Sequence, residues 1–123
     1  MIQGSVDANL LARIRLRIRG PNGVEFDVDT VVDTGFDDSL ILPSASISIL
    51  GLKMSSTGQA ILADGSVKHF DVYAADAEWD GVWRPVQVSA VGDEALMGMA
   101  MLVNTVVRIE VVPGGTVEIA RLP

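Results

Sequence analysis

Acidic side chains are concentrated between residues 25 and 38, and they are the groups in this sequence best suited to chemistry. The acids of this segment are Glu25, Asp27, Asp29, Asp33, Asp37 and Asp38. Carboxylates can hold a hard metal ion through oxygen, or they can move protons as a general acid or base. A calcium-binding loop needs alternating ligands, a central glycine and a terminal glutamate in one segment, and this spacing differs. We therefore predict no metal site here.

The triplet Asp33-Thr34-Gly35 has the most specific setting within this segment. It follows the apolar residues Val31 and Val32, and a second apolar stretch begins at Ser39. A carboxylate at the end of a buried strand is well placed for catalysis. The same triplet also suits an ordinary turn at the end of a strand, because Asp and Gly both favour turns. The triplet alone leaves both interpretations open.

Two alternating strands must position this triplet. Arginines alternate with apolar residues from Ile14 to Arg19, and acids alternate with apolar residues from Val24 to Asp29. Pro21-Asn22-Gly23 suits a three-residue hairpin loop, with Gly23 as its left-handed residue. That loop would pair Arg19 with Glu25, Arg17 with Asp27 and Arg15 with Asp29. A two-residue loop would set charged residues opposite apolar ones, so we predict the three-residue register.

The rest of the sequence predicts further hairpins and at most one or two short helices. Hairpins are expected over about 59–72 with a type I′ turn at Asp64-Gly65, over 73–90 with a turn at Asp80-Gly81, and over 106–119. The best helix candidate is 95–102, with Gly98 before its start, and 44–52 is ambiguous. We expect residues 1–123 to form a single all-β domain.

Two motifs in this order resemble the signatures of retropepsin-like (clan AA) aspartic proteases. The stretch from Val31 to Asp38 resembles the active-site loop of that family, and Ala95-Leu96-Met97-Gly98 resembles its second signature. A glycine-tipped hairpin lies between them, where the family carries its substrate-covering flap. With Phe36, the loop is most similar to a group of small bacterial and archaeal proteins. The resemblance covers roughly 14–122 and implies a closed, β-barrel-like acid-protease fold.

The resemblance implies an aspartic endopeptidase that is active as a homodimer. Asp33 from each of two chains would share a proton and activate water, while Thr34 and Gly35 would shape the loop, with Thr34 hydrogen-bonding across the two-fold axis. The residues that would contact a peptide or protein substrate are Phe36, Asp37, Asp38, Ala63, Asp64 and Gly65. For Asp37 and Asp38 a solvated loop is an equal alternative, and Asp64-Gly65 also suits an ordinary hairpin turn. No metal or organic cofactor is implied.

Two departures from the family pattern support a different class of function. Phe36 stands where Ala, Ser or Thr is usual, so it cannot hydrogen-bond the outer carboxylate oxygen, and we expect its bulk to crowd the substrate groove. Met99 and Ala100 follow Gly98, where retroviral proteases carry Arg and then Asp or Asn. A polar brace near the dimer interface is therefore missing. The alternative is a catalytically weak or inactive protease-like module that binds peptides or serves in assembly.

Composition excludes several other classes of function. The formal charge of −7 disfavours binding to nucleic acid, whose phosphates need basic patches. The sequence has no cysteine, so disulfides, thiolate metal sites and cysteine nucleophiles are excluded. We see no signal peptide and no apolar run long enough to cross a membrane, and we expect a cytoplasmic protein without membrane partners.

Overall fold

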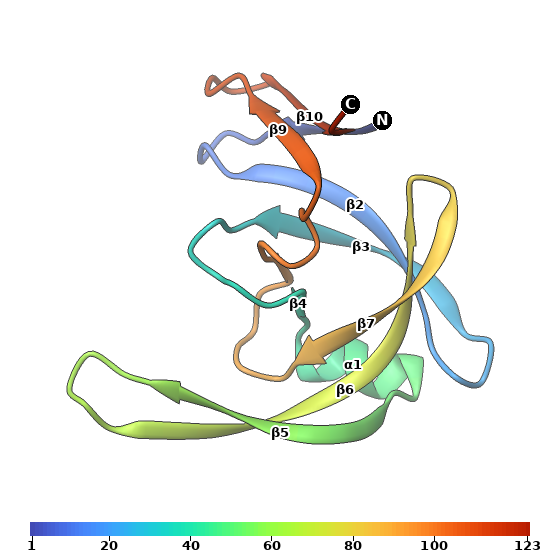
Figure 1. Cartoon of the computed structure of the whole chain (residues 1–123), viewed down its shortest axis with the longest axis vertical. Helices are drawn as coiled ribbons and strands as arrows, with labels where there is room; N and C mark the ends of the chain where they lie inside the picture. Colours follow the sequence, from blue (N-terminus) through green and yellow to red (C-terminus); the bar gives the residue numbers. More distant parts are fainter.

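Ten β-strands and one short α-helix make up the chain in the computed structural model, which describes residues 1–123 (Figure 1). The elements are β1 (Ile2–Val6), β2 (Ala12–Arg19), β3 (Glu25–Val32), β4 (Leu40–Ile41), α1 (Ser44–Leu50), β5 (Lys53–Ile61), β6 (Val67–Trp79), β7 (Val82–Ser89), β8 (Leu96–Met97), β9 (Thr105–Ile109) and β10 (Thr116–Arg121). All strands belong to one sheet, in the order β5-β6-β7-β4-β8-β3-β2-β1-β10-β9. The predicted all-β class is confirmed.

The sheet closes on itself because β6 pairs with β2 as well as with its hairpin partners. Two residue pairs make this closure, Ile18 with Ala77 and Arg19 with Asp76. Strands β2, β3, β8, β4, β7 and β6 therefore form a closed ring, as expected for a barrel-like fold. The outer strands β1, β10 and β9 continue from β2, and the β5–β6 hairpin extends beyond the ring (Figure 1).

The β2–β3 hairpin has the predicted three-residue loop and register. Arg19 lies opposite Glu25, and Gly23 has the left-handed φ of 81°. The ion pairs do not all join the residues that lie directly opposite each other. Arg17 bonds both Glu25, at 2.8 Å, and Asp27, at 3.2 Å, while Arg19 bonds Asp76 of β6, at 3.3 Å. Exposed pairs of this kind contribute roughly 0–1 kcal/mol each, so they fix register more than stability.

Apolar residues from all parts of the ring fill its interior. On β2 the alternation places Ile14, Leu16 and Ile18 inward, and each is at most 3% exposed. Helix α1 adds Ile47 and Leu50, and it ends at Gly51, whose φ of 63° suits the left-handed position after a helix. The ambiguous segment 44–52 is thus helical over most of its length.

Two local predictions are wrong. Residues 95–102 do not form a helix: Leu96 and Met97 are strand β8, and the residues after Gly98 form consecutive turns. The turn at Asp64-Gly65 is not type I′, which requires positive φ at both central residues. Only Gly65 has a positive φ there, and the loop has three residues, closed by the Leu62 N–H bonding the Ser66 carbonyl at 2.8 Å.

Strand β1 had no clear sequence signal, and the structure pairs it with β10 and β2. The only helix is seven residues long, and no helix in the structure has the length and apolar character needed to span a membrane. A cytoplasmic location stays a prediction.

Candidate active site

Asp33 lies immediately after β3, at the start of an exposed loop. Its backbone N–H donates to the Met97 carbonyl at 2.9 Å, which continues the pairing of β3 with β8 by one residue. Its carboxylate oxygen Oδ1 accepts the Gly35 N–H at 2.9 Å, and its carbonyl accepts the Phe36 N–H at 3.2 Å. The Asp33 backbone is thus held by the sheet, while its half-buried carboxylate caps the turn that follows.

The second sequence signature meets the first in the centre of the sheet. Strand β8 runs parallel to β3, where Val32 lies opposite Met97, and antiparallel to β4, where Leu40 lies opposite the same Met97. Both Met97 and Leu40 are fully buried. The two motifs, which are far apart in sequence, are therefore adjacent strands.

Three successive N–H groups hold the loop after Asp33 in place. Gly98 donates to the Ser39 carbonyl at 2.8 Å, Met99 to Phe36 at 2.8 Å and Ala100 to Asp38 at 3.2 Å. The Asp33 loop, defined as residues 33–39, is therefore fastened at both ends by residues 97–100. The bonds that follow within the segment, Met101 to Gly98 and Leu102 to Met99, span three residues and so make consecutive turns in place of an α-helix.

Phe36 lies against Gly98. A methyl group placed on Gly98 would be 2.4 Å from Phe36 Cδ2 and 2.1 Å from the Asp38 carbonyl oxygen. Only glycine therefore permits this approach of the two segments. One edge of the half-buried Phe36 ring lies against Gly98, and its expected crowding of a substrate groove stays a prediction.

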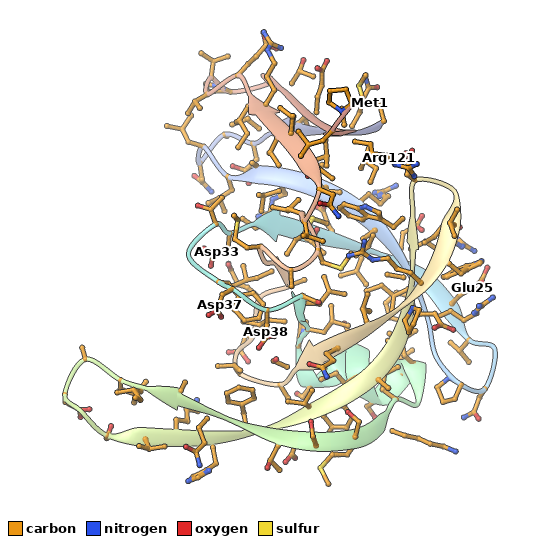
Figure 2. The ribbon with its side chains drawn as sticks, viewed as in Figure 1. Met1, Glu25, Asp33, Asp37, Asp38 and Arg121 are labelled. Carbon is orange, nitrogen blue, oxygen red and sulfur yellow. The ribbon has the colours of Figure 1, made fainter.

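Asp37 and Asp38 lie exposed on the same loop as Asp33 (Figure 2). Neither forms an ion pair, and Thr34 and Gly35 are exposed as well. The loop thus presents three carboxylates without a protein cation. No group of three or more His, Asp or Glu side chains is arranged to hold a metal ion.

Ala63, Asp64 and Gly65 lie apart from the Asp33 loop, at the tip of the β5–β6 hairpin. In the view of Figure 1 this tip and the Asp33 loop project from the same side of the molecule. Asp64 Oδ1 accepts the Ser66 hydroxyl at 2.6 Å and the Ser66 N–H at 2.9 Å. These bonds, the hydroxyl first, lower the pKa of Asp64. No hydrogen bond joins the tip to the Asp33 loop.

The hairpin tip exposes apolar side chains. Ile61 is 79% exposed, and Leu62 and Val67 are about half exposed. Farther from the tip, the ring of Phe70 lies over Gly58, where an added methyl group would be 2.5 Å from two ring atoms. Exposed aliphatic side chains on a projecting hairpin can contact an apolar ligand or a second protein surface.

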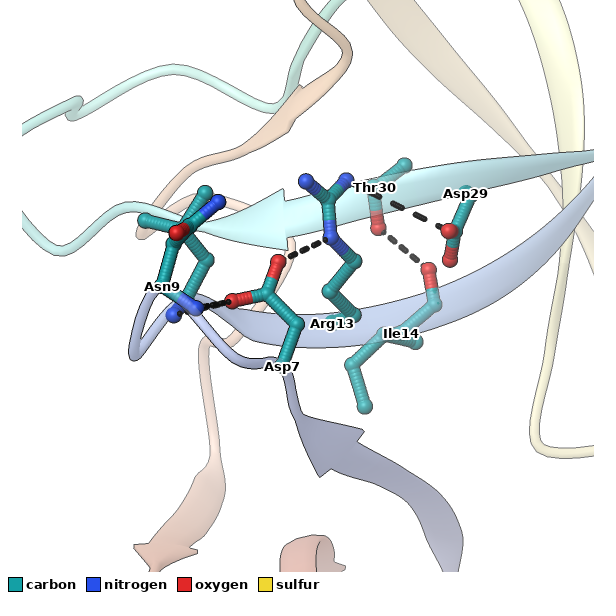
Figure 3. Close-up of polar contacts among 7 residues, drawn as sticks. Asp7, Asn9, Arg13, Ile14, Asp29 and Thr30 are labelled. Atoms are coloured by element: carbon teal, nitrogen blue, oxygen red, sulfur yellow. Dashed lines mark hydrogen bonds and ion pairs between the residues drawn. The ribbon is translucent and has the colours of Figure 1, made fainter. Parts of the chain in front are cut away.

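Two sets of polar contacts on β2 and β3 were not predicted from the sequence. Thr30, fully buried on β3, donates its hydroxyl to the Ile14 carbonyl of β2 at 2.7 Å (Figure 3). Arg13 on β2 bonds Asp7 at 2.9 Å, with Asp29 at 4.0 Å on its other side. The hydrogen bonds that Asp7 accepts, first from the Leu11 N–H and then from Arg13, lower its pKa. The bond of Thr30 could have been anticipated, because a threonine within an apolar stretch of a strand needs a partner for its hydroxyl group.

The four principal hollows of the single chain lie away from Asp33. The largest, about 480 Å³, is polar and lies between β1 and β2, where Gln3 and Arg13 line it. Another, of about 380 Å³, lies between α1 and Tyr73 of β6. None of the four has a residue of the Asp33 loop in its wall. Four residues of the loop, Thr34, Gly35, Asp37 and Asp38, are exposed, so the single chain presents the loop on an open surface.

Comparisons with known proteins agree on the fold. A retropepsin-like aspartic protease from Rickettsia conorii matches 98% of this chain and 89% of its own, with a TM-score of 0.65 and 17% sequence identity. The EIAV protease, solved with the inhibitor HBY-793, matches 75% of this chain and 85% of its own, with a TM-score of 0.50 and 15% identity. No protein-family model and no curated protein matches the sequence. The chain has a retropepsin-like fold.

Proposed function

We propose that this chain, with its retropepsin-like fold, is an aspartic endopeptidase that acts as a homodimer. The observation that carries the proposal is the setting of Asp33. Its carboxylate begins a loop fastened by the second signature at Met97 and Gly98, so a reactive group is held at a defined place on an open surface. The fold of the structural neighbours, two of which are named as proteases, supports the same conclusion.

The homodimer follows from the number of catalytic groups. Asp-Thr-Gly occurs once in the sequence, and a water molecule held between two carboxylates needs two of them. A two-fold axis beside the Asp33 loop would bring one Asp33 from each chain together. Thr34 is exposed and therefore free to bond across that axis. The open surface around the loop in the single chain is consistent with a site completed by a second copy.

The paired carboxylates would divide the acid and base roles. Two close carboxylates cannot both ionise, so they share one proton. The ionised Asp33 takes a proton from the water, whose oxygen attacks the peptide carbonyl carbon. The protonated Asp33 of the other chain gives its proton to the carbonyl oxygen, and proton transfer to the leaving nitrogen then completes cleavage.

An extended peptide is the substrate class that this arrangement supports. The peptide would lie between the Asp33 loop and the β5–β6 hairpin, with main-chain hydrogen bonds giving affinity. Asp37 and Asp38 are exposed on the loop and could accept peptide N–H groups. The exposed Ile61 and Leu62 would contact apolar substrate side chains when the hairpin covers the peptide, so we infer a preference for apolar residues.

Phe36 favours the second candidate, a protease-like module that binds peptides without cleaving them. The Gly35 N–H is the one donor that reaches the Asp33 carboxylate within the chain, and phenylalanine offers no hydroxyl for a second. Such a module would still dimerise and bind a peptide in the groove, but it would not cleave the peptide.

One pair of measurements separates these candidates. Sedimentation gives the oligomeric state, and a peptide-library assay between pH 4 and 7 compares the wild-type protein with Asp33→Asn. We expect a dimer and cleavage that Asp33→Asn removes. Equal cleavage by both proteins, or no cleavage despite a stable dimer, would exclude the endopeptidase, and peptide binding in the second case would support the module.

A further inference from the structure

Arg84 occupies a core-facing position on β7. The next residues on the same face, Val86 and Val88, are 7% and 0% exposed, and Ala77 directly opposite Arg84 is 0% exposed. Arg84 itself is half-buried, so its guanidinium loses part of its contact with water and is stabilised by hydrogen-bond partners within the chain. Burial lowers the pKa of Arg84 by desolvation. The position therefore raises the question of which partners hold the guanidinium.

The partners of Arg84 are backbone carbonyls and an aromatic ring, not a carboxylate. Its Nη2 donates to the Met101 carbonyl oxygen at 3.2 Å, with Met101 Sδ at 3.4 Å and the Ala100 carbonyl oxygen at 3.5 Å. Its guanidinium carbon lies 5.1 Å from the centroid of the Trp79 ring. The ring and the carbonyls together orient the guanidinium.

Arg84 reaches the two carbonyls in the turn 98–102 that no backbone N–H satisfies. These are the carbonyls of Ala100 and Met101, whereas the other carbonyls of the turn accept N–H groups from the turn or from Thr105. Arginine side chains stabilise the last carbonyls of a helical turn in this way. Arg84 is therefore the cap of this turn.

The capped turn is also the segment that fastens the Asp33 loop. Residues 98–100 donate their three N–H groups to the loop carbonyls of Ser39, Phe36 and Asp38, in that order. Arg84 thus binds carbonyl groups of the turn, while N–H groups of the same turn bind the loop. The two sets of contacts meet at Ala100, whose N–H bonds the Asp38 carbonyl and whose own carbonyl accepts from Arg84.

We propose that Arg84 is a positioning residue, which fixes the Asp33 loop by capping the turn 98–102. It supplies from β7 a polar brace that Met99 and Ala100, the residues after Gly98, cannot supply. The positioning role stands on these contacts, and only its effect on catalysis rests on the proposed endopeptidase function.

Amide hydrogen exchange tests the positioning role directly. Arg84→Met keeps an apolar stem and removes the donors. Arg108→Met is the control, because Arg108 is an exposed arginine on β9 whose one ion pair is with Glu110. In Arg84→Met we expect the amides of residues 98–100 to exchange roughly tenfold faster or more, the effect of losing a charged hydrogen bond. The β2–β3 amides should keep their rates, and Arg108→Met should match the wild type.

Two results would overturn the proposal: unchanged exchange at residues 98–100, or an equal acceleration over the whole chain. Arg84→Lys keeps one donor for Met101 and should restore part of the protection. Should Arg84→Met fail to fold, the wild-type protein still decides. The guanidinium protons of Arg84 should exchange more slowly with water than those of Arg108, and equal rates would contradict the role.

Peptide cleavage supplies a readout that a merely structural residue would not move. We expect Arg84→Met to lower kcat more than it changes KM, with the dimer intact by sedimentation. If the wild-type protein cleaves no peptide, the endopeptidase proposal fails, but the exchange experiment still judges the positioning role. If cleavage is normal in Arg84→Met while exchange is faster, the loop is not positioned for catalysis by Arg84.

Discussion

Phe36 of the Asp33 loop is in contact with Gly98, at the start of the turn after β8. Phe36 also accepts the N–H of Met99 at 2.8 Å through its carbonyl, so its ring contacts the second signature and its backbone bonds the residue that follows it. The two signatures therefore form one packed unit, and a change in either should be felt in the other.

Gly98→Ala tests this contact most directly. The added methyl group would lie 2.1 Å from the Asp38 carbonyl oxygen, a backbone atom that can move only with the loop. We expect a loss of about 3 kcal/mol in the free energy of unfolding, at the upper end for overpacking. Urea titration measures this, and any cleavage activity should fall as well. Gly92→Ala is the control, because a methyl group there meets nothing within 4 Å and should change stability little.

Thr30→Val removes the buried hydroxyl that joins β3 to β2. Valine has a similar shape, so the expected loss of roughly 1–3 kcal/mol reflects the lost bond to the Ile14 carbonyl. Thr57→Val, at an exposed position on β5, should leave the free energy of unfolding nearly unchanged. Equal effects from the two substitutions would show that the Thr30 bond does not stabilise the fold.

The tip of the β5–β6 hairpin should respond to acid. The pKa of Asp64 in the folded chain lies below its ordinary value of 3.8, so its bonds to Ser66 favour the folded tip above that pH. This contribution falls as the pH drops from about 3.8 through the lowered pKa. The Ser66 amide shift in NMR should follow this titration, and Asp64→Asn should abolish it. A Ser66 amide that titrates only above pH 4 would contradict this assignment.

Ile61→Ser tests the hairpin tip as a substrate contact. Because Ile61 is 79% exposed, the substitution should change the free energy of unfolding by less than about 0.5 kcal/mol. If the tip covers apolar substrate side chains, KM for such peptides should rise several-fold. Val82→Ser is the matched control, since Val82 is 63% exposed at the tip of a different hairpin. A rise in KM for both variants would point to a nonspecific effect.

The local sequence pattern was sufficient to predict those parts of the fold that depend on residues close together in the chain. The charges on β2 and β3 predicted their register, and the Asp33 triplet lies at the end of a strand as expected. The segment after Gly98 was mispredicted because consecutive turns, closed by three-residue bonds such as Met101 to Gly98, bury its apolar residues as a helix would. Helix periodicity cannot distinguish these cases.

The position of Arg84 could have been noticed in the sequence, but its role could not have been predicted from it. An arginine continuing the buried alternation of Val86 and Val88 is an anomaly that could have been noticed. Its partners could not, because they are carbonyls in a turn that only the closed fold brings near. The pairing of two Asp33 side chains would need a second copy of the chain, and it stays a prediction.

The closure of the ring by β2 and β6 has a consequence for how the chain folds. Only two residue pairs make that seam, and they join positions nearly half the chain apart. Contacts between residues so distant in sequence form late and slow the search for the native state, because the intervening chain must be ordered first. The local hairpins should therefore appear early, and the long-range pairings, the seam at Ile18 and Ala77 among them, should form later. A core variant such as Ala77→Gly should accordingly accelerate unfolding more than it slows folding.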